Sequence, residues 1–228
     1  MTSGGRELLK WIALVLMTGD HVAKAFYGGY VPVVSEAGRI AFPLFALVMA
    51  YNLAQPGADL SKSIRRLALW AVIAQPVHAL VFGYWIPLNV LATFALAAAA
   101  IAIASRRNWL GFAAAVGPAP LLVDYQWSGV LLVVGAWAWY DHHARYRLCR
   151  VMVMDWFEES KLYGSRWLML LMLVALCLYN GNAWALLALP LFVLGRLPWA
   201  LPRTRWAFYG YYVGHLALIA VSAHILAA

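Results

Sequence analysis

Long apolar stretches separated by short polar connections run along almost the whole chain. The apolar runs are continuous and lack the alternation of a membrane β-strand, so they predict α-helices. A helix needs about 20 apolar residues to cross a bilayer. The pattern predicts nine spans, near residues 9–28, 38–55, 64–83, 88–105, 108–123, 127–141, 165–180, 183–198 and 206–226. The fold class that follows is all-α, with residues 1–228 forming one polytopic transmembrane bundle.

Composition narrows the class of protein further. Hydrophobic residues make up 65% of the 228 positions and charged residues only 11%, whereas soluble domains carry about 25% charged residues. The sequence therefore predicts an integral membrane protein, and its short connections leave no room for a separate soluble enzyme domain. Cys149 and Cys177 predict no disulfide, because one lies among arginines and the other in an apolar run.

The positive charges fall almost entirely on alternate connections. The net charge of +8 could indicate a nucleic-acid partner, but the positive-inside rule explains it more simply. With the N-terminus in the cytoplasm, fifteen of the 17 Lys and Arg residues lie on the cytoplasmic side, and the exceptions are Lys24 and Arg39. We therefore expect a multi-pass membrane protein, surrounded by lipid and without a nucleic-acid partner. Residues 142–164 mix basic and apolar side chains and predict a short helix on the cytoplasmic surface.

Four ionisable residues lie where the pattern predicts hydrocarbon. Asp20, His21 and Lys24 belong to the first span, and Arg39 begins the second. A charge at a helix centre costs on the order of 2.5–3.5 kcal/mol even on lenient insertion scales, so such groups need a partner or a wet cavity. Asp20 and Lys24 are spaced i,i+4 and can pair along one helix face, whereas His21 points roughly 100° away from Asp20. These residues are candidates for a functional site. The alternatives are a structural ion pair and, for Arg39, snorkelling to the interface.

Other polar positions are weaker candidates. Tyr212 and His215 share one face of the last span, and Asp124 lies at the outer end of the fifth. Each of them alone is more often structural than functional. The sequence has no nucleophile elbow, zinc-protease motif or Gly-rich phosphate loop, and His142-His143 has only Cys149 nearby as a further soft ligand. We therefore expect no metal site.

Three functional classes fit these residues. The first is a membrane acyltransferase that uses His21 as its general base. The second is a small transporter in which Asp20, Lys24 and Arg39 act as a charge relay. The third is a structural or assembly protein whose ion pairs only fix the packing of the helices.

Several short motifs narrow the choice. The opening run is Leu9-Lys10-x-Ile12-Ala13-Leu14-x2-Met17-x2-Asp20-His21, and a second block covers residues 38–45 (Gly-Arg-Ile-Ala-Phe-Pro-Leu-Phe). Shorter motifs are Arg66-Leu67, Gln75-Pro76, Asn89, Asp124-Tyr125 with Gly129, and Tyr212-x2-His215-Leu216. Together they resemble the TraX family, the conjugation-associated pilin acetylases. The sequence departs from the family pattern at Gln126-Trp127 and at Val213-Gly214.

The resemblance implies a protein of the bacterial inner membrane. It would transfer an acetyl group from cytoplasmic acetyl-CoA to the N-terminal amine of a pilin subunit in the membrane, with O-acyl transfer or another acceptor as alternatives. His21 would act as general base. Arg39 or Lys24 would stabilise the oxyanion, and Asp20 would position one of these cations. Three further residues would orient His21 or act as alternative acids or bases: His215, Tyr212 and Asp124. The acetyl-CoA phosphates would meet inner-face arginines that the topology also explains, namely Arg65, Arg66, Arg106 and Arg107.

Overall fold

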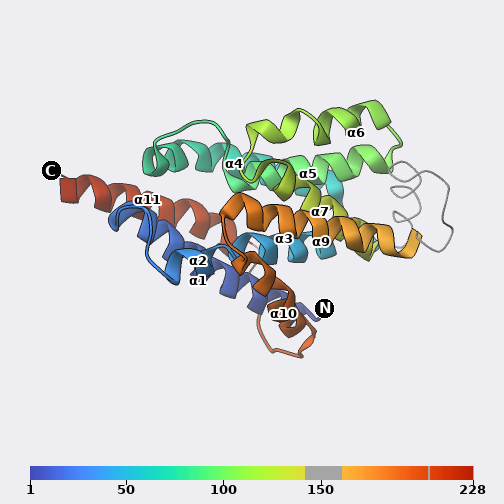
Figure 1. Cartoon of the computed structure of the whole chain (residues 1–228), viewed down its shortest axis with the longest axis horizontal. Helices are drawn as coiled ribbons and strands as arrows, with labels where there is room; N and C mark the ends of the chain where they lie inside the picture. The colour runs from blue at the N-terminus through green and yellow to red at the C-terminus, as the bar shows by residue number, and fades with distance from the viewer. Residues whose placement is uncertain (142–160, 205, 228) are drawn as a thin grey trace.

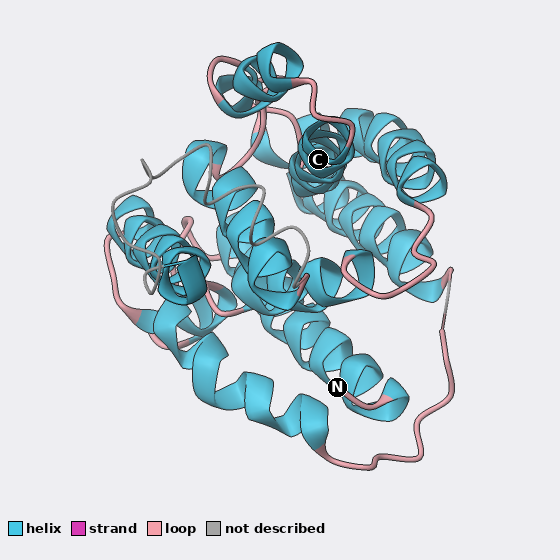
Figure 2. Cartoon of the chain, turned by 90° about the vertical axis from the view of Figure 1, so that its right-hand side faces the viewer, coloured by secondary structure: helices cyan, strands magenta, loops and turns pink. Residues whose placement is uncertain are grey.

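The structure, a computed structural model, describes residues 1–141, 161–204 and 206–227. Over these residues the chain is helical and forms no β-strand (Figure 2). The α-helices are α1 (Ser3–Phe26), α2 (Val34–Gly38), α3 (Ala41–Leu53), α4 (Leu60–Phe82), α5 (Val90–Ser105), α6 (Trp109–Val116), α7 (Gln126–Tyr140), α9 (Lys161–Asn180), α10 (Ala188–Phe192) and α11 (Ala207–Ala227). Short 3₁₀ helices lie between them, namely η1 (Ala119–Leu122), η2 (Trp184–Leu187) and η3 (Val193–Arg196).

The predicted all-α fold is confirmed, since each predicted apolar stretch overlaps one or more helices. Among the described residues, three helices are long and apolar enough to cross a membrane. They are Val34–Leu53, which joins α2 and α3, Leu60–Phe82 and Ala207–Leu226. Shorter apolar helices cover Val90–Ser105, Trp109–Leu122, Arg166–Asn180 and Trp184–Arg196. The number of nine spans and the N-terminus-in orientation stay predictions.

Two predicted elements differ in detail. The fifth stretch is split, because α6 ends at Val116, with Gly117 as its C-cap, and η1 follows Pro118. Proline has no N–H to continue a helix and disfavours helical geometry in the residue before it. The predicted surface helix over 142–164 lies outside the described residues, apart from 161–164, which form the first turn of α9.

The exterior of the bundle is apolar where helices face outward. Leu80 on α4, Leu110 on α6 and Leu178 on α9 keep 76%, 85% and 78% of their surface exposed. Leucines this exposed on several apolar helices suit contact with lipid better than contact with water. The helices and their exterior are thus those of a membrane protein.

Side-chain caps fix the ends of the two helices that carry most of the polar residues. The Thr2 hydroxyl accepts a hydrogen bond from the backbone N–H of Gly5 at 2.9 Å and begins α1. The Asp59 carboxylate accepts one from the backbone N–H of Lys62 at 2.8 Å and begins α4. Helix α4 ends at Gly83, whose φ of 78° favours glycine because a Cβ would clash in this region.

Helices α1 and α11 lie side by side and run in the same direction (Figure 1). Phe208 in the first turn of α11 contacts Trp11 of α1, with ring centroids 5.1 Å apart. About two turns later on α11 and almost three turns later on α1, the ring of His215 stacks on that of His21. Helix α11 also packs along α4. The polar residues of three helices far apart in sequence are thereby brought together.

Helices α3, α5, α7 and α9 form the other part of the bundle. Helix α7 is its centre: Val130, Val133 and Val134 are almost fully buried. It packs against α3, α5 and, most extensively, α9. A Cβ at Gly135 would lie 3.2 Å from the backbone nitrogen of Met169, so the absence of a side chain lets α7 and α9 approach closely. This apolar part holds α3 in place beside α1.

A buried polar contact joins α4 to the start of α5. The side-chain oxygen of Gln75, Oε1, accepts hydrogen bonds from both the backbone and the side-chain nitrogen of Asn89, at 2.9 and 2.7 Å. The Asn89 side chain also donates to the Ala71 carbonyl at 2.8 Å, and Gln75 donates to the Trp85 carbonyl. Asn89 is fully buried, so these satisfied bonds are needed to offset its desolvation. The Gln75-Pro76 and Asn89 motifs therefore have a structural explanation.

Substitution of Gly38 by alanine tests the close approach of α1 and α2. A Cβ at Gly38 would collide with the Cβ of Asp20, and overpacking of this kind costs about 1–3 kcal/mol. We expect Gly38→Ala to lower the thermal unfolding midpoint in detergent by several degrees. Gly210→Ala is the control, because a Cβ there meets no atom within 4 Å and alanine favours a helix. Equal midpoints for the two variants would contradict this packing.

Candidate functional site

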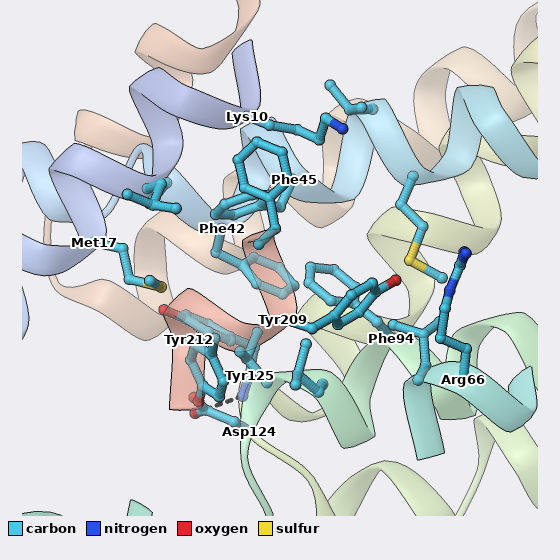
Figure 3. A pocket seen from close by; sticks show the side chains of 18 of the residues that line it. Lys10, Met17, Phe42, Phe45, Arg66, Phe94, Asp124, Tyr125, Tyr209 and Tyr212 are labelled. Carbon is cyan, nitrogen blue, oxygen red and sulfur yellow. Dashed lines mark hydrogen bonds between the residues drawn. The ribbon is translucent and has the colours of Figure 1, made fainter. Parts of the chain in front are cut away.

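An elongated cavity of about 570 Å³ lies between α1, α3, α4 and α11. This volume is in the range of small-molecule sites. We call one end the basic end, where the first turns of α1, α4 and neighbouring segments supply Arg6, Lys10, Lys62, Arg66 and Arg203. We call the other the histidine end, where later turns supply Asp20, His21, Lys24 and His78, together with Asp124. In Figure 3, Lys10 lies at the top, Arg66 at the right and Asp124 at the lower left, with aromatic rings between them.

The basic end has a surplus of positive charge. Its lining includes five cations but only two carboxylates, Glu7 and Asp59. Both carboxylates are engaged, because Glu7 pairs with Lys10 at 2.6 Å and Asp59 caps α4. Arg66 has a buried Nε without a hydrogen-bond partner, and its guanidinium lies 5.5 Å from the centroid of the Tyr209 ring. An anionic ligand with several charges suits this end of the cavity.

The middle of the cavity is apolar. Phe42 stacks on Tyr125, with ring centroids 4.0 Å apart and an angle of 20° between the rings, and on Phe94 with centroids 5.4 Å apart. Other apolar side chains complete the lining here, including Leu14, Met17, Phe45, Val48, Met49 and Leu67. An uncharged, flexible chain can lie along such a wall without desolvation of a charge.

The ion pair expected from the i,i+4 spacing forms at the histidine end. Lys24 Nζ lies 2.7 Å from Asp20 Oδ2. Asp20 is only 6% exposed, and its other oxygen, Oδ1, is buried without a hydrogen-bond partner. One oxygen of this carboxylate is thus committed to Lys24 and the other has an unused capacity to accept.

His21 and His215 are joined by a hydrogen bond whose direction can be worked out. His21 Nδ1 lies 2.9 Å from His215 Nε2, and His215 Nδ1 lies 2.9 Å from the Tyr211 carbonyl oxygen. The carbonyl can only accept, so His215 Nδ1 donates to it. In a neutral His215, Nε2 is then the acceptor and His21 Nδ1 the donor. This leaves a lone pair on Nε2 of His21, which forms no hydrogen bond within the described part of the chain.

A third histidine, His78, lines the same end. It is 3% exposed, and its Nδ1 is buried without a partner. Its ring packs against Phe82 and Tyr84, with centroids 4.8 and 5.3 Å away. Phe82 also contacts the ring of His21 edge-on at 5.2 Å. An unpaired buried polar atom costs about 1–3 kcal/mol, so a hydrogen-bonding ligand at this end would recover part of that cost.

Asp124 reaches this end from the connection between η1 and α7. Its Oδ1 accepts a hydrogen bond from the backbone N–H of Tyr125 at 2.9 Å, and its carbonyl accepts one from the Thr93 hydroxyl at 2.7 Å. Burial raises the pKa of the Asp124 carboxyl. Burial and the nearby Asp124 carboxylate raise the pKa of Tyr84 to about 12, so its hydroxyl stays protonated.

The cavity brings together most of the residues predicted to act near the reacting atoms. Five of them line it, namely Asp20, His21, Lys24, Asp124 and Tyr212, and His215 bonds to His21. Arg39 caps α2 and does not line the cavity. Across the described residues it forms no ion pair. Of the arginines predicted to meet phosphates, Arg66 lines the cavity, whereas Arg65, Arg106 and Arg107 do not.

Several lining residues were not among the predicted site residues. Lys62 and Arg203 had been explained by topology alone, and Tyr84 and His78 had no role. Lys62 precedes Arg66 by four residues, so a shared helix face was a usable signal. For Arg203 and Tyr84 no signal was available, because both lie outside helices and reach the cavity only through the tertiary fold. Within the described residues, no group of three or more metal-ligating side chains occurs.

A family model described as TraX protein matches residues 5–222 of this chain. The chain belongs to the TraX family. The motif resemblance is therefore confirmed over almost the full length, including α1 and α11, which carry the paired histidines.

Individual relatives match over a shorter stretch. The chain is 38% identical over 117 residues to "Protein TraX" of Escherichia coli, a match that covers 50% of this chain and 45% of the relative. It is 36% identical over 113 residues to "Protein TraX" of Escherichia coli strain K12, with the same coverage of 50% and 45%. The chain thus spans about half the length of the curated TraX relatives it matches. No solved structure matches it.

Replacement of His215 tests the histidine pair. His215→Ala leaves His21 Nδ1–H without an acceptor in a buried place, which costs about 1–3 kcal/mol, so we expect a lower thermal midpoint. His215→Gln should lose less stability, because its amide oxygen can accept from His21. The matched control is His224→Ala, which removes an exposed histidine of the same helix and should change stability by less than about 0.5 kcal/mol. The hydrogen bond would be unimportant if all three variants melted alike.

Proposed function

We propose that this TraX-family protein is an integral-membrane acetyltransferase, which moves an acetyl group from acetyl-CoA to an acceptor amine. By family resemblance the acceptor is the N-terminal amine of a conjugative pilin subunit. The observation that carries the proposal is the continuity of the cavity: one space joins the basic end to His21 through an apolar middle. Coenzyme A has the same order of parts, with charged phosphates, a largely uncharged pantetheine arm and a reactive thioester.

The dimensions agree with this donor. Arg66 and His78 are twelve residues apart on α4, which is about 18 Å along a helix. Lys10 and His21 are eleven residues apart on α1, or about 16 Å. The arm between the phosphate oxygen and the sulfur of CoA has about twelve bonds, and it extends to roughly 14 Å at the ~3.5 Å per three bonds of a peptide chain. The arm is thus a few Å shorter than either spacing, and the reach of the Arg66 and His21 side chains into the cavity would close that gap.

The transfer step uses His21 as base. The amine nitrogen attacks the thioester carbon, a C–N bond forms, and the carbonyl electron pair moves to oxygen. His21 Nε2 takes the proton that the nitrogen loses, since Nδ1 already donates to His215. When the oxyanion collapses, the C–S bond breaks and the imidazolium returns its proton to the thiolate. The products are an amide and free CoA, and the histidine regains its starting state.

Lys24 is the better placed of the two proposed oxyanion stabilisers. It lines the cavity beside His21, whereas Arg39 does not. Asp20 holds Lys24 Nζ at 2.7 Å, so the ammonium group is positioned before the reaction. A fixed cation in a water-poor site can stabilise the oxyanion strongly, because no solvent reorganisation is needed.

The proposed orientation of the protein in the membrane follows from its Lys and Arg residues. Placing the N-terminus in the cytoplasm puts the basic end of the cavity on that side, where acetyl-CoA is available, and satisfies the positive-inside rule. The histidine end then lies deeper or toward the outer face, where a pilin N-terminus could meet it. A bacterial inner membrane with several spans of this chain is the location that this arrangement requires.

Two adjacent arginines test the donor site. We expect Arg66→Gln to weaken acetyl-CoA binding by about tenfold, since one charge-assisted contact to phosphate contributes about 1.5–3 kcal/mol. Arg65→Gln removes the same charge one position earlier, from an exposed residue that does not line the cavity, and should change affinity by less than twofold. Binding is measured by acetyl-CoA-dependent thermal stabilisation of purified protein, with acetate as the negative ligand. Equal effects of the two substitutions would contradict the assigned site.

His21→Ala tests the chemistry. Loss of the base should reduce acetyl transfer to a peptide amine by ~10²-fold or more, while acetyl-CoA still stabilises the protein. The rate is measured as CoA release and peptide mass increase. A wild-type rate in His21→Ala would remove His21 from the mechanism.

Solute flux in liposomes without CoA dependence would instead favour a transporter. Loss of folding alone after joint Asp20→Asn and Lys24→Gln replacement would favour an assembly protein.

A further inference from the structure

Asp124 is a carboxylate without a cation of its own. Over the described residues, the ion pairs are Lys10 with Glu7 and Lys24 with Asp20. Asp124 takes part in neither of these ion pairs. Lys24 and Arg39 are near enough to act on Asp124 electrostatically, but Lys24 is held by Asp20. A carboxylate removed from bulk water costs several kcal/mol unless a cation or water compensates it.

Aromatic residues line the cavity near this carboxylate. Tyr84, Tyr125 and Tyr212 line the same end of the cavity, and each interacts electrostatically with Asp124. Figure 3 shows Asp124, Tyr125 and Tyr212 close together. No hydrogen bond joins any of the three hydroxyls to Asp124 in the described structure. The rings therefore lie near the carboxylate without neutralising it.

The position of Asp124 is fixed. Its backbone N–H donates to the Leu88 carbonyl at 2.8 Å, and its own carbonyl accepts from Thr93. Tyr125, the next residue, has a φ of 59° and stacks on Phe42. A Cβ at Gly129 would lie 2.7 Å from the Cβ of Tyr125, so α7 presses closely against this segment. A rigid carboxylate among aromatic faces is a preformed cation site, because the rings attract cations and the carboxylate accepts hydrogen bonds.

Two buried polar atoms at the same end also have no partner. They are Asp20 Oδ1 and His78 Nδ1, on residues 6% and 3% exposed that line the cavity. Both are able to accept a hydrogen bond. Together with Nε2 of His21 and the carboxylate of Asp124, they give this end several acceptors without a hydrogen-bond partner, beside the donors of Lys24 and the tyrosines. A ligand with N–H groups can bond to these acceptors.

We propose that Asp124, with the rings of Tyr84, Tyr125 and Tyr212, forms a subsite for a primary ammonium group, which is the acceptor in its protonated form. The subsite rests on the proposed function for its role, because it places the acceptor nitrogen beside His21. Asp124 is the counter-ion of the ammonium and takes its first proton.

The proton count explains why a second base is useful. A primary ammonium must lose one proton before its lone pair can attack and a second as the amide forms. Asp124 takes the first, which converts a buried ion pair into a neutral acid and amine, and later releases it to solvent. His21 takes the second and returns it to the CoA thiolate. No charge is left on the new amide, and each proton has a named acceptor.

Asp124→Asn tests the subsite. Asparagine keeps the oxygen that accepts from the Tyr125 N–H but loses the charge. With a peptide bearing a free N-terminal amine, we expect KM for the peptide to rise about tenfold or more, the effect of one charge-assisted bond, while KM for acetyl-CoA stays within about twofold. The kcat/KM of the variant should also rise with pH toward the amine's own pKa of ~7.7–8.0, because only the neutral amine can then bind productively. Glu36→Gln is the matched control, a carboxylate that does not line the cavity.

A ring substitution gives a second readout. Tyr84 is 38% exposed, so its replacement disturbs packing less than that of buried Tyr212. Tyr84→Phe keeps the aromatic face and should leave the peptide KM within about twofold, whereas Tyr84→Leu should raise it about threefold or more, the loss of one cation–π contact. Equal KM values for the two would argue against the ring contribution.

The outcomes separate this inference from the proposed function. The ammonium subsite alone would be overturned if Asp124→Asn still transferred acetyl groups with the wild-type KM for the amine peptide and the wild-type pH dependence of kcat/KM. If the protein transfers no acetyl group, the proposed function fails. Direct binding of the amine peptide without acetyl-CoA then still tests the subsite, against the same peptide with a hydroxyl in place of the amine. Equal affinity for the two peptides would overturn it.

Discussion

The cost of charge in an apolar bundle shapes the arrangement of α1, α4 and α11. Asp20, Lys24 and Asp124 cannot face lipid without a penalty of several kcal/mol. All three line one cavity inside the bundle. Asp20 and Lys24 compensate each other at 2.7 Å. The parallel packing of α11 on α1 then places His215 against His21. The bundle thus keeps its polar groups inside, and the exterior stays apolar.

This arrangement links the local geometry to a chemical capability. The hydrogen bonds from His21 to His215 and from His215 to the Tyr211 carbonyl select one tautomer of His21 and leave its Nε2 able to accept a proton. The cations at the other end of the cavity are too far away to take part in that step, but they suit the phosphates of a long donor. The apolar middle of the cavity separates the cations that would hold the phosphates from the residues around the thioester. Binding energy from the phosphates can therefore position the thioester at the histidine end.

The sequence was informative about helices and about contacts within one helix. The apolar stretches predicted where helices lie, and the i,i+4 spacing predicted the Asp20–Lys24 pair, because both depend on local periodicity. Contacts between helices were harder to predict. His215 was a candidate partner of His21 only through its shared face with Tyr212 and the family motif. Arg65 and Arg66 looked equivalent in sequence, and only the rotation of α4 separates them. Arg203 and Tyr84 join the site through connections whose path no periodicity encodes.

A structure of the protein with a non-hydrolysable acetyl-CoA analogue tests the central claim most directly. The account predicts the diphosphate at the basic end, within hydrogen-bond distance of Arg66, the pantetheine arm along Phe42 and Phe45, and the sulfur beside His21. An analogue bound outside the cavity, or inside it with its phosphates at the histidine end, would contradict the account.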